Sequence, residues 1–365
     1  MTADRRPTFC TLQNIHNVHL TKEVGLIPYA MHKFKNYDAF MATYRNDEYS
    51  NLKYTPGLRM EFIPKVSGNW IIDSCLWLIR NAKRIDVLNI YHPVMRTFAH
   101  ARTYKLLNPG GKIYLKFDGA YGRHNRGTFW KRMCYNWLVK HAYCVSTELD
   151  GNDKVLSDDW GRKILCVPNP INPNELSDFR PFSERSNVIF TAGRLGTKQK
   201  ATEILLDAFV KIAPNIPGWT LKLAGGFEEN INIARDFYSA HPELAGRVIF
   251  TGDIRDRKEI TEMYRDAKIF AFPSRWESFG IALTEAMMNG CFAVATDIPS
   301  TRSLTENFRL ALGFKVDDVD GLAKNLLYAC THEAEIEPIA REARTIITER
   351  CDLRRICDVI ADGLS

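Results

Sequence analysis

The sequence alternates between short β-type runs and longer helix-type runs, and it does so twice. In the first half, runs such as RIDVLNIY (84–91) and KIYLKF (112–117) are separated by helix-type segments such as VMRTFAHARTYKLL (94–107). Strands that alternate with helices of 10–15 residues predict βαβ units, which place the strands in a parallel sheet with right-handed crossovers. The alternation restarts with NVIFTAG (187–193). We therefore expect an α/β fold with two doubly wound, Rossmann-like domains.

Residues 168–182, PNPINPNELSDFRPF, separate the two halves. They contain four prolines and three asparagines and have no hydrophobic period, which is typical of a linker. We place an N-terminal domain at 1–168, a linker at 169–182, a C-terminal domain at 183–345 and a helical tail at 346–365. The tail helix is expected to pack back on the first domain. Since open α/β sheets bind ligands outside the carboxyl ends of their strands, we expect a cleft between the two sheets.

Composition limits the class of protein. The chain has 365 residues, of which 45% are hydrophobic and 25% are charged, as in globular proteins. No apolar run approaches the roughly 18 residues that span a bilayer, and we expect no signal peptide. The nine cysteines are odd in number and lack metal-type spacing, which favours buried thiols in a reducing cytoplasm.

Charge is shared unevenly between the two halves. Residues 1–180 hold 26 basic and 16 acidic side chains, a balance of +10, whereas residues 181–365 hold 23 and 27, a balance of −4. A basic half indicates an anionic partner, either nucleic acid or an anionic membrane surface, although basic side chains can also simply solvate helices.

Residues 271–290, AFPSRWESFGIALTEAMMNG, contain a helix that is apolar on most sides. Ser278 is the expected N-cap of this helix. The first amides of a helix have no partner within it and attract phosphate. The amides expected to be available are those of Phe279, Gly280 and Ile281.

Two glutamates lie in this largely apolar stretch. Glu285 falls inside the helix, and a buried carboxylate is costly unless it accepts hydrogen bonds, which a diol such as ribose would donate. Glu277 precedes the helix and is expected to face the mouth of the cleft. The pattern also allows both carboxylates to reach solvent along a narrow polar seam.

A second group of residues follows the strand-like run at 187–193. The segment GRLGTKQK (193–200) places Arg194, Lys198 and Lys200 in a strand-to-helix loop, where cations and free amides suit a phosphate. It matches neither the dinucleotide-binding glycine pattern nor a P-loop, and by itself it could be a solvated basic loop. Glycines also follow later strands, at Gly225, Gly226 and Gly252.

Together these motifs resemble those of retaining GT-B glycosyltransferases of the GT4 type. Glu277 and Glu285, seven residues apart after a strand that ends in FPS, are similar to the EX7E signature of that family. GRLGTKQK resembles its phosphate loop, and CVPNPI (166–171) resembles its linker. The resemblance covers residues 165–330, whereas the first domain matches mainly in its α/β pattern.

The resemblance implies a role for each of these residues. Arg194 and Lys200 would bind the donor diphosphate with the amides of Phe279, Gly280 and Ile281. Glu285 would accept hydrogen bonds from the ribose, and Glu277 would lie near the donor sugar. The nucleotide base would rest against residues 252–255, including Asp253 and Ile254. No metal is expected, because cations and a helix terminus stabilise the leaving group.

Two departures from the family pattern leave choices open. The family's lysine falls five residues after the arginine, but Gln199 stands there, so Lys198 and Lys200 compete and we favour Lys200. The family's glycine pair after the first strand is reduced here to Gly25, in the apparent loop NVHLTKEVGLIP (17–28). The family's sugar-binding histidine is replaced by Asp118, with His92 as a second candidate.

The segment FWKRMCYNWLVKHAY (129–143) combines basic and aromatic residues. This composition suits a helix at a membrane interface, although an amphipathic helix packed on its sheet has the same pattern. The resemblance implies that the first domain binds the acceptor, which is often lipid-linked in this family.

The resemblance therefore implies a retaining glycosyltransferase that moves a sugar from a nucleotide-sugar donor, by default a UDP-sugar, to a hydroxyl acceptor, and we expect this reaction to serve surface polysaccharide or glycolipid synthesis. Its expected partners are the donor, a glycan or lipid-linked acceptor and an anionic membrane surface, and not nucleic acid. We expect a cytoplasmic protein, peripheral at the inner face of the plasma membrane, that needs no cofactor. A nucleotide-sugar 2-epimerase and a non-catalytic nucleotide-sugar-binding subunit are the alternatives.

Overall fold

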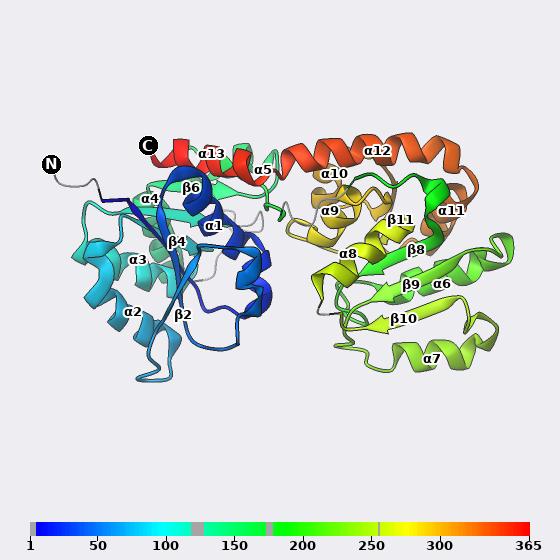
Figure 1. Cartoon of the computed structure of the whole chain (residues 1–365), viewed down its shortest axis with the longest axis horizontal. Helices are drawn as coiled ribbons and strands as arrows, with labels where there is room; N and C mark the ends of the chain where they lie inside the picture. Colours follow the sequence, from blue (N-terminus) through cyan, green and yellow to red (C-terminus); the bar gives the residue numbers. More distant parts are fainter. Residues whose placement is uncertain (1–4, 118–127, 173–177, 255) are drawn as a thin grey trace. The chain divides into compact units, whose positions relative to one another are not determined.

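The computed structural model describes residues 5–117, 128–172, 178–254 and 256–365. The chain divides into two compact units (Figure 1). The first, called the N-unit below, comprises Met1–Asn174 and Cys351–Ser365, and the second, called the C-unit, comprises Glu175–Arg350. The last 15 residues thus belong to the same unit as the start of the chain.

The N-unit is built on a parallel sheet of seven strands in the order β3-β2-β1-β4-β5-β6-β7. The strands are β1 (Thr8–Leu12), β2 (Asp38–Thr43), β3 (Arg59–Phe62), β4 (Val87–Tyr91), β5 (Lys112–Lys116), β6 (Cys144–Thr147) and β7 (Leu165–Cys166). The order reverses between β1 and β4, as in doubly wound folds. The strands β4 and β5 fall within the β-type runs that the sequence predicts at 84–91 and 112–117.

Helices cover both faces of this sheet. Successive residues of a strand point to opposite faces, so Phe9 packs into one core and Cys10 into the other. The first core includes α1 (Glu23–Lys35) and α13 (Leu353–Leu364), which pack against each other. The second core includes residues of α2 (Trp70–Asn81), α3 (Met95–Leu107), α4 (Phe129–His141) and α5 (Asn152–Trp160).

The packing of α13 on the N-unit confirms the expectation for the tail helix. Its apolar face, which includes Ile356 and Ile360, is buried in the core with α1. Lys35 of α1 forms an ion pair of 2.7 Å with Asp358 of α13. The helix α12 (Glu333–Arg350), which precedes it, belongs to the C-unit.

The C-unit is built on a parallel sheet of six strands in the order β10-β9-β8-β11-β12-β13. They are β8 (Ser186–Ala192), β9 (Thr220–Ala224), β10 (Val248–Gly252), β11 (Ala267–Phe272), β12 (Phe292–Thr296) and β13 (Ala311–Phe314). The order reverses between β8 and β11, so the carboxyl ends of these two neighbours form the switch point where doubly wound sheets bind ligands.

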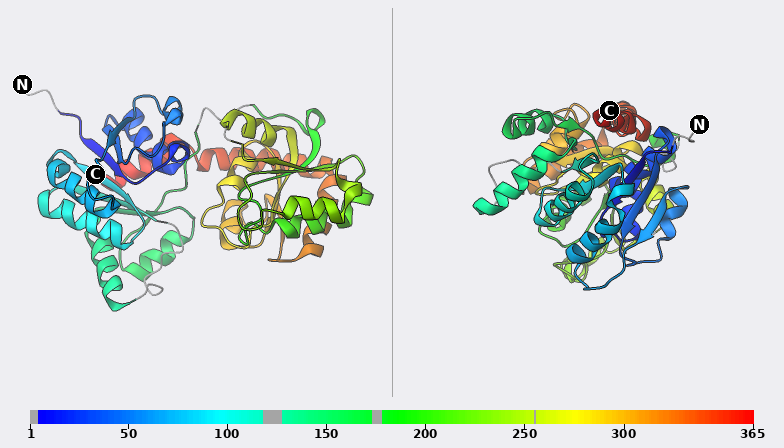
Figure 2. Two further views of the ribbon diagram at one scale, coloured as in Figure 1. Left: turned by 90° about the horizontal axis from the view of Figure 1, so that it is seen from below. Right: turned by 90° about the vertical axis from the view of Figure 1, so that its left-hand side faces the viewer.

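Two helical layers enclose this sheet (Figure 2). One core contains residues of α6 (Thr202–Ile212), α7 (Ile233–Ala240), α11 (Val319–Thr331) and α12. On the other face, Tyr264 of α8 (Arg257–Asp266) packs against Phe190 and Phe270. The remaining helices are α9 (Ile281–Met288) and α10 (Pro299–Leu304). Short 3₁₀ turns are η1 (Asn17–Thr21), η2 (Ser50–Tyr54), η3 (Ala82–Arg84), η5 (Phe182–Glu184), η6 (Ala213–Asn215) and η7 (Pro242–Leu244).

The loop predicted at 17–28 is wrong, because these residues form η1 and the first turns of α1. Gly25 and Pro28, both poor helix formers, lie inside α1. Gly25 is required there because a Cβ would lie 2.4 Å from the carbonyl oxygen of Leu20. None of the described helices is both long enough and apolar enough to cross a membrane. The structure pairs none of the nine cysteines in a disulfide, and six of them are buried as expected, whereas Cys75, Cys134 and Cys166 are half-buried.

Candidate functional site

The candidate site lies at the switch point of the C-unit, where the loops after β8 and β11 meet. The first loop carries Arg194 and Lys200, and the second carries Glu277 and leads into α9. Adjacent parallel strands bring their following loops together, which explains how residues 77 positions apart in sequence come into contact.

Lys200 and Glu277 form the central contact of this site. The Nζ atom of Lys200 lies 2.5 Å from Oε1 of Glu277, and the two side chains are 18% and 11% exposed. The ammonium also lies over the ring of Phe272, 5.6 Å from its centroid. By contrast, Lys198 is exposed, and its backbone N–H donates to Glu229. This geometry favours Lys200 over Lys198 as the lysine of the site.

Gln199 and Arg275 fix the loop that carries Lys200. The side chain of Gln199 accepts a hydrogen bond of 2.6 Å from Arg194 and donates one of 2.9 Å to the carbonyl of Trp276. Arg275 donates to the carbonyl of Lys198 at 2.6 Å and forms ion pairs of 2.6 Å with two carboxylates, Glu203 and Asp317. The loops after β8 and β11 are therefore held together by several bonds.

The helix α9 begins later than the sequence predicts. Its N-cap is Gly280, with φ of 96°, and no side chain caps it in the part of the chain that the structure describes, so the expected role of Ser278 is wrong. A positive φ is easily adopted only by glycine, which explains this residue. Phe279 and Gly280 are buried, and Ile281 is the first helical residue. The amides of the first turn follow Glu277 by only a few residues, and such amides are available to water or an anion.

Glu285 obtains its hydrogen-bond donors from α8. Its Oε1 lies 2.7 Å from Arg257, and its Oε2 accepts a bond of 3.1 Å from the hydroxyl of Tyr264. Burial, and then the charge of Glu285, raise the pKa of Tyr264 well above its ordinary value, so the hydroxyl remains a donor. The protein thus satisfies this carboxylate without a diol.

The two glutamates differ less in burial than the sequence suggests. The side chain of Glu285 is 15% exposed, whereas that of Glu277, expected at the mouth of a cleft, is 11% exposed. Both are mostly buried and paired with cations, rather than aligned along a solvent-exposed polar seam of the helix.

A small cavity of about 10 Å³ lies beside Lys200, lined also by Gly193, Phe272 and Ser274. The hydroxyl of Ser274 is buried and has no hydrogen-bond partner among the described residues. A buried hydroxyl beside an ammonium group offers a further polar contact at the carboxyl end of β11.

The other predicted site residues lie elsewhere. Asp253 and Ile254 directly follow β10, where Asp253 is exposed and Ile254 is half-buried. Gly25 and His92 belong to the N-unit, and His92 follows β4 with a φ of 63°. Asp118 lies outside the described residues. Among the residues described, no three His, Cys, Asp or Glu side chains gather as a metal site would require.

Sequence reasoning missed Gln199, Arg275, Arg257 and Tyr264. The signal for the last two was the buried carboxylate of Glu285, which required donors from some neighbouring element. A single sequence does not show that α8 supplies them.

Residues 173–345 match the family model of glycosyl transferases group 1. The match covers nearly all of the C-unit, including its candidate site, and amounts to just under half of the chain.

Two curated relatives are mannosyltransferases. The phosphatidyl-myo-inositol mannosyltransferase of Mycolicibacterium smegmatis is 27% identical over 171 residues, which is 46% of this chain and 43% of the relative. The lipopolysaccharide core biosynthesis mannosyltransferase LpsB of Rhizobium meliloti is 33% identical over 107 residues, or 27% of this chain and 28% of LpsB. The matches thus span less than half the length of these relatives.

The solved structures extend the likeness to both units. The crystal structure of HepE from Anabaena in complex with UDP matches 98% of this chain and 99% of HepE, with a TM-score of 0.78 and 17% identity. At this identity the likeness shows the fold. The chain has two Rossmann-like domains of the GT-B type, as the sequence predicts.

Proposed function

We propose that this protein is a retaining glycosyltransferase that moves a sugar from a nucleotide-sugar donor to a hydroxyl acceptor. The observation that carries the proposal is the contact between Lys200 and Glu277 at the switch point, beside the uncapped start of α9. Both lie in the segment that matches glycosyl transferases group 1. UDP is our proposed donor nucleotide, supported by its presence in HepE, and the names of the two relatives make mannose a candidate sugar.

The proposed roles follow from charge and position. Lys200 and Arg194 supply cations, and α9 supplies amides, for the donor diphosphate. Arg257 and Tyr264 orient the carboxylate of Glu285. This carboxylate accepts hydrogen bonds from the ribose hydroxyls while it keeps its contact with Arg257. Glu277 lies at the donor sugar, and Asp253 and Ile254 border the base. Asp118 keeps its proposed contact with the sugar, whereas Gly25, buried inside α1, is no longer proposed as a donor contact.

In the proposed reaction, the bond between the anomeric carbon and the diphosphate oxygen breaks. A new bond forms on the same face between that carbon and the acceptor oxygen, whose proton passes to the departing phosphate. Cations and helix amides stabilise the negative charge on the leaving group, which is the contribution that a metal ion makes in other enzymes. We propose that no metal is needed.

We propose a lipid-linked or glycan acceptor at an anionic membrane surface. Helix α4 supports this proposal, because its C-terminal part is buried and its N-terminal part is exposed. Leu138 and Val139 are buried in the N-unit core, whereas Phe129, Met133 and Trp130 are exposed, the last by 73%. Lys131 and Arg132, between these apolar side chains, are also exposed. The first turns of α4 thus present apolar and basic groups together, as interfacial helices do.

A thermal-shift screen across UDP-, GDP- and ADP-sugars tests the donor part of the proposal. A ligand that binds only the folded state raises Tm, by an amount that grows with concentration above Kd. We expect one nucleotide to stabilise the protein selectively. If no nucleotide or nucleotide sugar did so, the proposed donor site would be contradicted.

Product analysis then separates the enzyme classes. A transferase releases the nucleoside diphosphate and needs an acceptor. A 2-epimerase instead returns an isomeric nucleotide sugar without an acceptor. A binding subunit gives neither product and retains its function in Glu277→Ala.

A further inference from the structure

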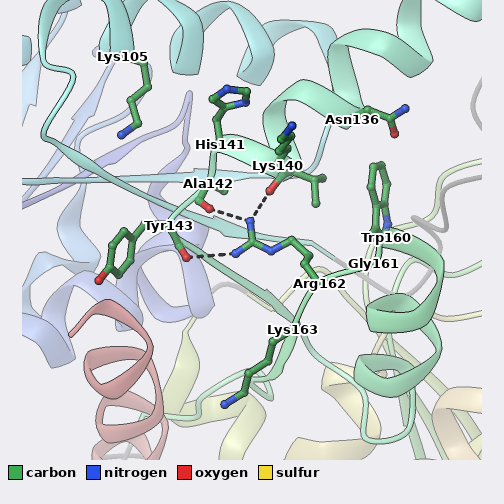
Figure 3. Close-up of a pocket in the computed structure, with 11 residues that line it drawn as sticks. Lys105, Asn136, Lys140, His141, Ala142, Tyr143, Trp160, Gly161, Arg162 and Lys163 are labelled. Carbon is green, nitrogen blue, oxygen red and sulfur yellow. Dashed lines mark hydrogen bonds between the residues drawn. The ribbon is translucent and has the colours of Figure 1, made fainter.

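A second pocket, of about 650 Å³, lies in the N-unit. It is lined by the C-terminal ends of α3, α4 and α5 and by the segments that lead from α4 into β6 and from α5 into β7, with Lys105, His141, Trp160 and Lys163 among its side chains (Figure 3). It therefore lies at the amino ends of the strands, the opposite edge of the sheet from the carboxyl ends where ligands of doubly wound folds bind. Its volume is within the range of small-molecule sites.

The lining is positively charged. Lys105, Lys140, Arg162 and Lys163 line the pocket, together with His141, and none of the described residues that line it is an aspartate or glutamate. In the part of the chain that the structure describes, none of these four cations lies within ion-pair distance of a carboxylate. The pocket thus holds four cationic side chains without an anionic partner.

The negative ends of helices balance only part of this positive charge. Three helices end at the pocket, and each helix C-terminus carries about half a negative charge, about 1.5 in total. Four cations exceed this by about two to three charges. A phosphate monoester carries about two negative charges near neutral pH, so it matches the excess.

Two of the cations are held in place by backbone carbonyls. Arg162 donates to Val139, Ala142 and Tyr143 at 2.5, 2.8 and 3.2 Å. Lys105 donates to the carbonyl of Gly111 at 2.6 Å and to that of Pro109 at 3.1 Å. Burial lowers the pKa of Arg162 and that of Lys105, as expected for cations removed from water without a counter-charge.

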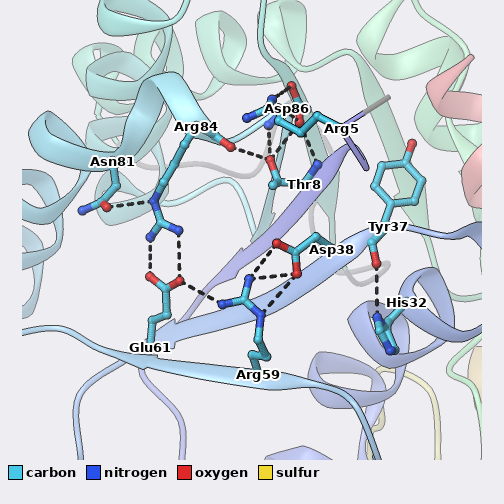
Figure 4. Close-up of polar contacts among 10 residues, drawn as sticks. All are labelled: Arg5, Thr8, His32, Tyr37, Asp38, Arg59, Glu61, Asn81, Arg84 and Asp86. Carbon is cyan, nitrogen blue, oxygen red and sulfur yellow. Dashed lines mark hydrogen bonds and ion pairs between the residues drawn. The ribbon is translucent and has the colours of Figure 1, made fainter. Parts of the chain in front are cut away.

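On the same edge of the sheet, at β1 to β4, arginine side chains are paired with carboxylates. There Arg5 pairs with Asp86 at 2.7 Å, Arg59 pairs with Asp38 at 2.8 Å, and Arg84 pairs with Glu61 (Figure 4). At the amino edge of β1–β4, each of these arginines thus pairs with a carboxylate. At the amino edge of β5–β7, Arg162 and Lys105 instead donate hydrogen bonds to backbone carbonyls. The excess charge is therefore local to the pocket.

We propose that this pocket binds a small phosphorylated anion, at a site separate from the donor site of the C-unit. Lys140 and Lys163, which are exposed and extend in different directions (Figure 3), would attract the phosphate by their charge, with Arg162 and Lys105 fixing the positive potential along the wall of the pocket. The proposal does not depend on the proposed glycosyl transfer.

Pyrophosphate is the probe for the test, measured by titration calorimetry on the full chain with Lys200→Ala, which weakens binding at the donor site. Lys140→Gln/Lys163→Gln removes two pocket cations that make no structural bond among the described residues. The matched control, Lys83→Gln/Lys154→Gln, removes two exposed lysines of the same unit that do not line the pocket. We expect affinity to fall at least about tenfold in the pocket variant and to stay unchanged in the control.

Lysine acetylation read by mass spectrometry gives a second measurement on the unaltered protein. Pyrophosphate is expected to protect at least one of Lys140 and Lys163 but not Lys154. Vesicles with phosphatidic acid identify the source of the phosphate, since protection by vesicles alone would indicate a lipid headgroup. Equal affinity of the pocket and control variants, or protection of neither lysine by either probe, would overturn the proposal.

Discussion

At the scale of single residues, two partly buried ion pairs define the candidate site. Lys200 with Glu277 and Arg257 with Glu285 are each less than a quarter exposed. Removing one partner of such a pair leaves an uncompensated charge, which is more damaging than losing an exposed pair. These residues are therefore informative targets, provided that folding is measured beside activity.

Glu277→Ala is expected to lower turnover by about 100-fold or more, because it removes a charge next to the proposed position of the donor sugar. The change is measured as kcat with the donor found in the nucleotide screen. Glu259→Ala, which removes an exposed carboxylate from α8, is the matched control and should retain activity. Near-normal turnover of a folded Glu277→Ala protein would remove this residue from the reacting centre.

Tyr264→Phe is expected to lower the free energy of unfolding by about 1.5–3 kcal/mol, the range for a hydrogen bond to a charged group. Its hydroxyl donates to Glu285 in a buried setting. Tyr238→Phe removes a hydroxyl that donates to a neutral carbonyl, that of Val248, and should cost about 0.5–1.5 kcal/mol. Denaturant unfolding measures both, and equal costs would show that the charge of Glu285 adds nothing.

At the scale of elements, the sequence predicts the strands well because buried parallel strands are short apolar runs between turns. The run RIDVLNIY contains β4, and KIYLKF contains β5. Helix α1 was missed because local propensity counts Gly25 and Pro28 against a helix, whereas burial of its apolar side chains against β1, β2 and α13 favours it. Tertiary packing of this kind is not visible in a local window.

In the candidate site, too, local patterns predict the position of residues along the chain but not their tertiary contacts. The order of the motifs along the chain predicts that Lys200 and Glu277 follow strands. Their contact depends on β8 and β11 being neighbours, which the strand order decides. The donors to Glu285 lie 28 and 21 residues before it, in another helix, so no short pattern could indicate them.

The contact between α2 and α3 predicts a pH dependence of stability. His100 is buried, and its Nε2 lies 2.7 Å from the hydroxyl of Ser74. Burial, and then the charge of Arg96, lower the pKa of His100 to about 3. The unfolded chain, with a pKa of about 6.5, therefore takes up a proton that the folded state does not.

This contribution to stability is fully present above pH 6.5 and is lost as the pH falls toward 3. The free energy of unfolding should fall by about 1.4 kcal/mol per pH unit from this group alone. Denaturant unfolding between pH 7 and pH 4 should show a shallower loss in His100→Gln than in the wild type. Substitution of the exposed His332 is the control, and identical slopes in all three proteins would contradict the assignment.

At the scale of the whole molecule, charge follows the division into units. The N-unit holds 27 basic and 17 acidic side chains, a balance of +10, and the C-unit holds 22 and 26, a balance of −4. The basic unit also carries the exposed apolar side chains at the start of α4. Proposed acceptor and donor roles thus fall on units of opposite charge.

Binding to vesicles tests the role of the N-unit. We expect binding to require anionic lipid and to weaken as salt rises, because each basic residue near an anionic surface contributes about 1 kcal/mol that salt screens. Lys131→Gln/Arg132→Gln should weaken binding about tenfold or more in a sedimentation assay. Equal binding to neutral vesicles would count against the electrostatic account.

The central claim is that Lys200 and the start of α9 bind the donor diphosphate, and calorimetric titration with the stabilising nucleotide tests it most directly. Lys200→Ala should weaken binding at least about tenfold, the loss of one charge-assisted contact with phosphate. Lys198→Ala, which removes an exposed lysine from the same loop, should bind the nucleotide as the wild type does. Unchanged affinity in a folded Lys200→Ala protein, or a larger loss in Lys198→Ala, would contradict the account.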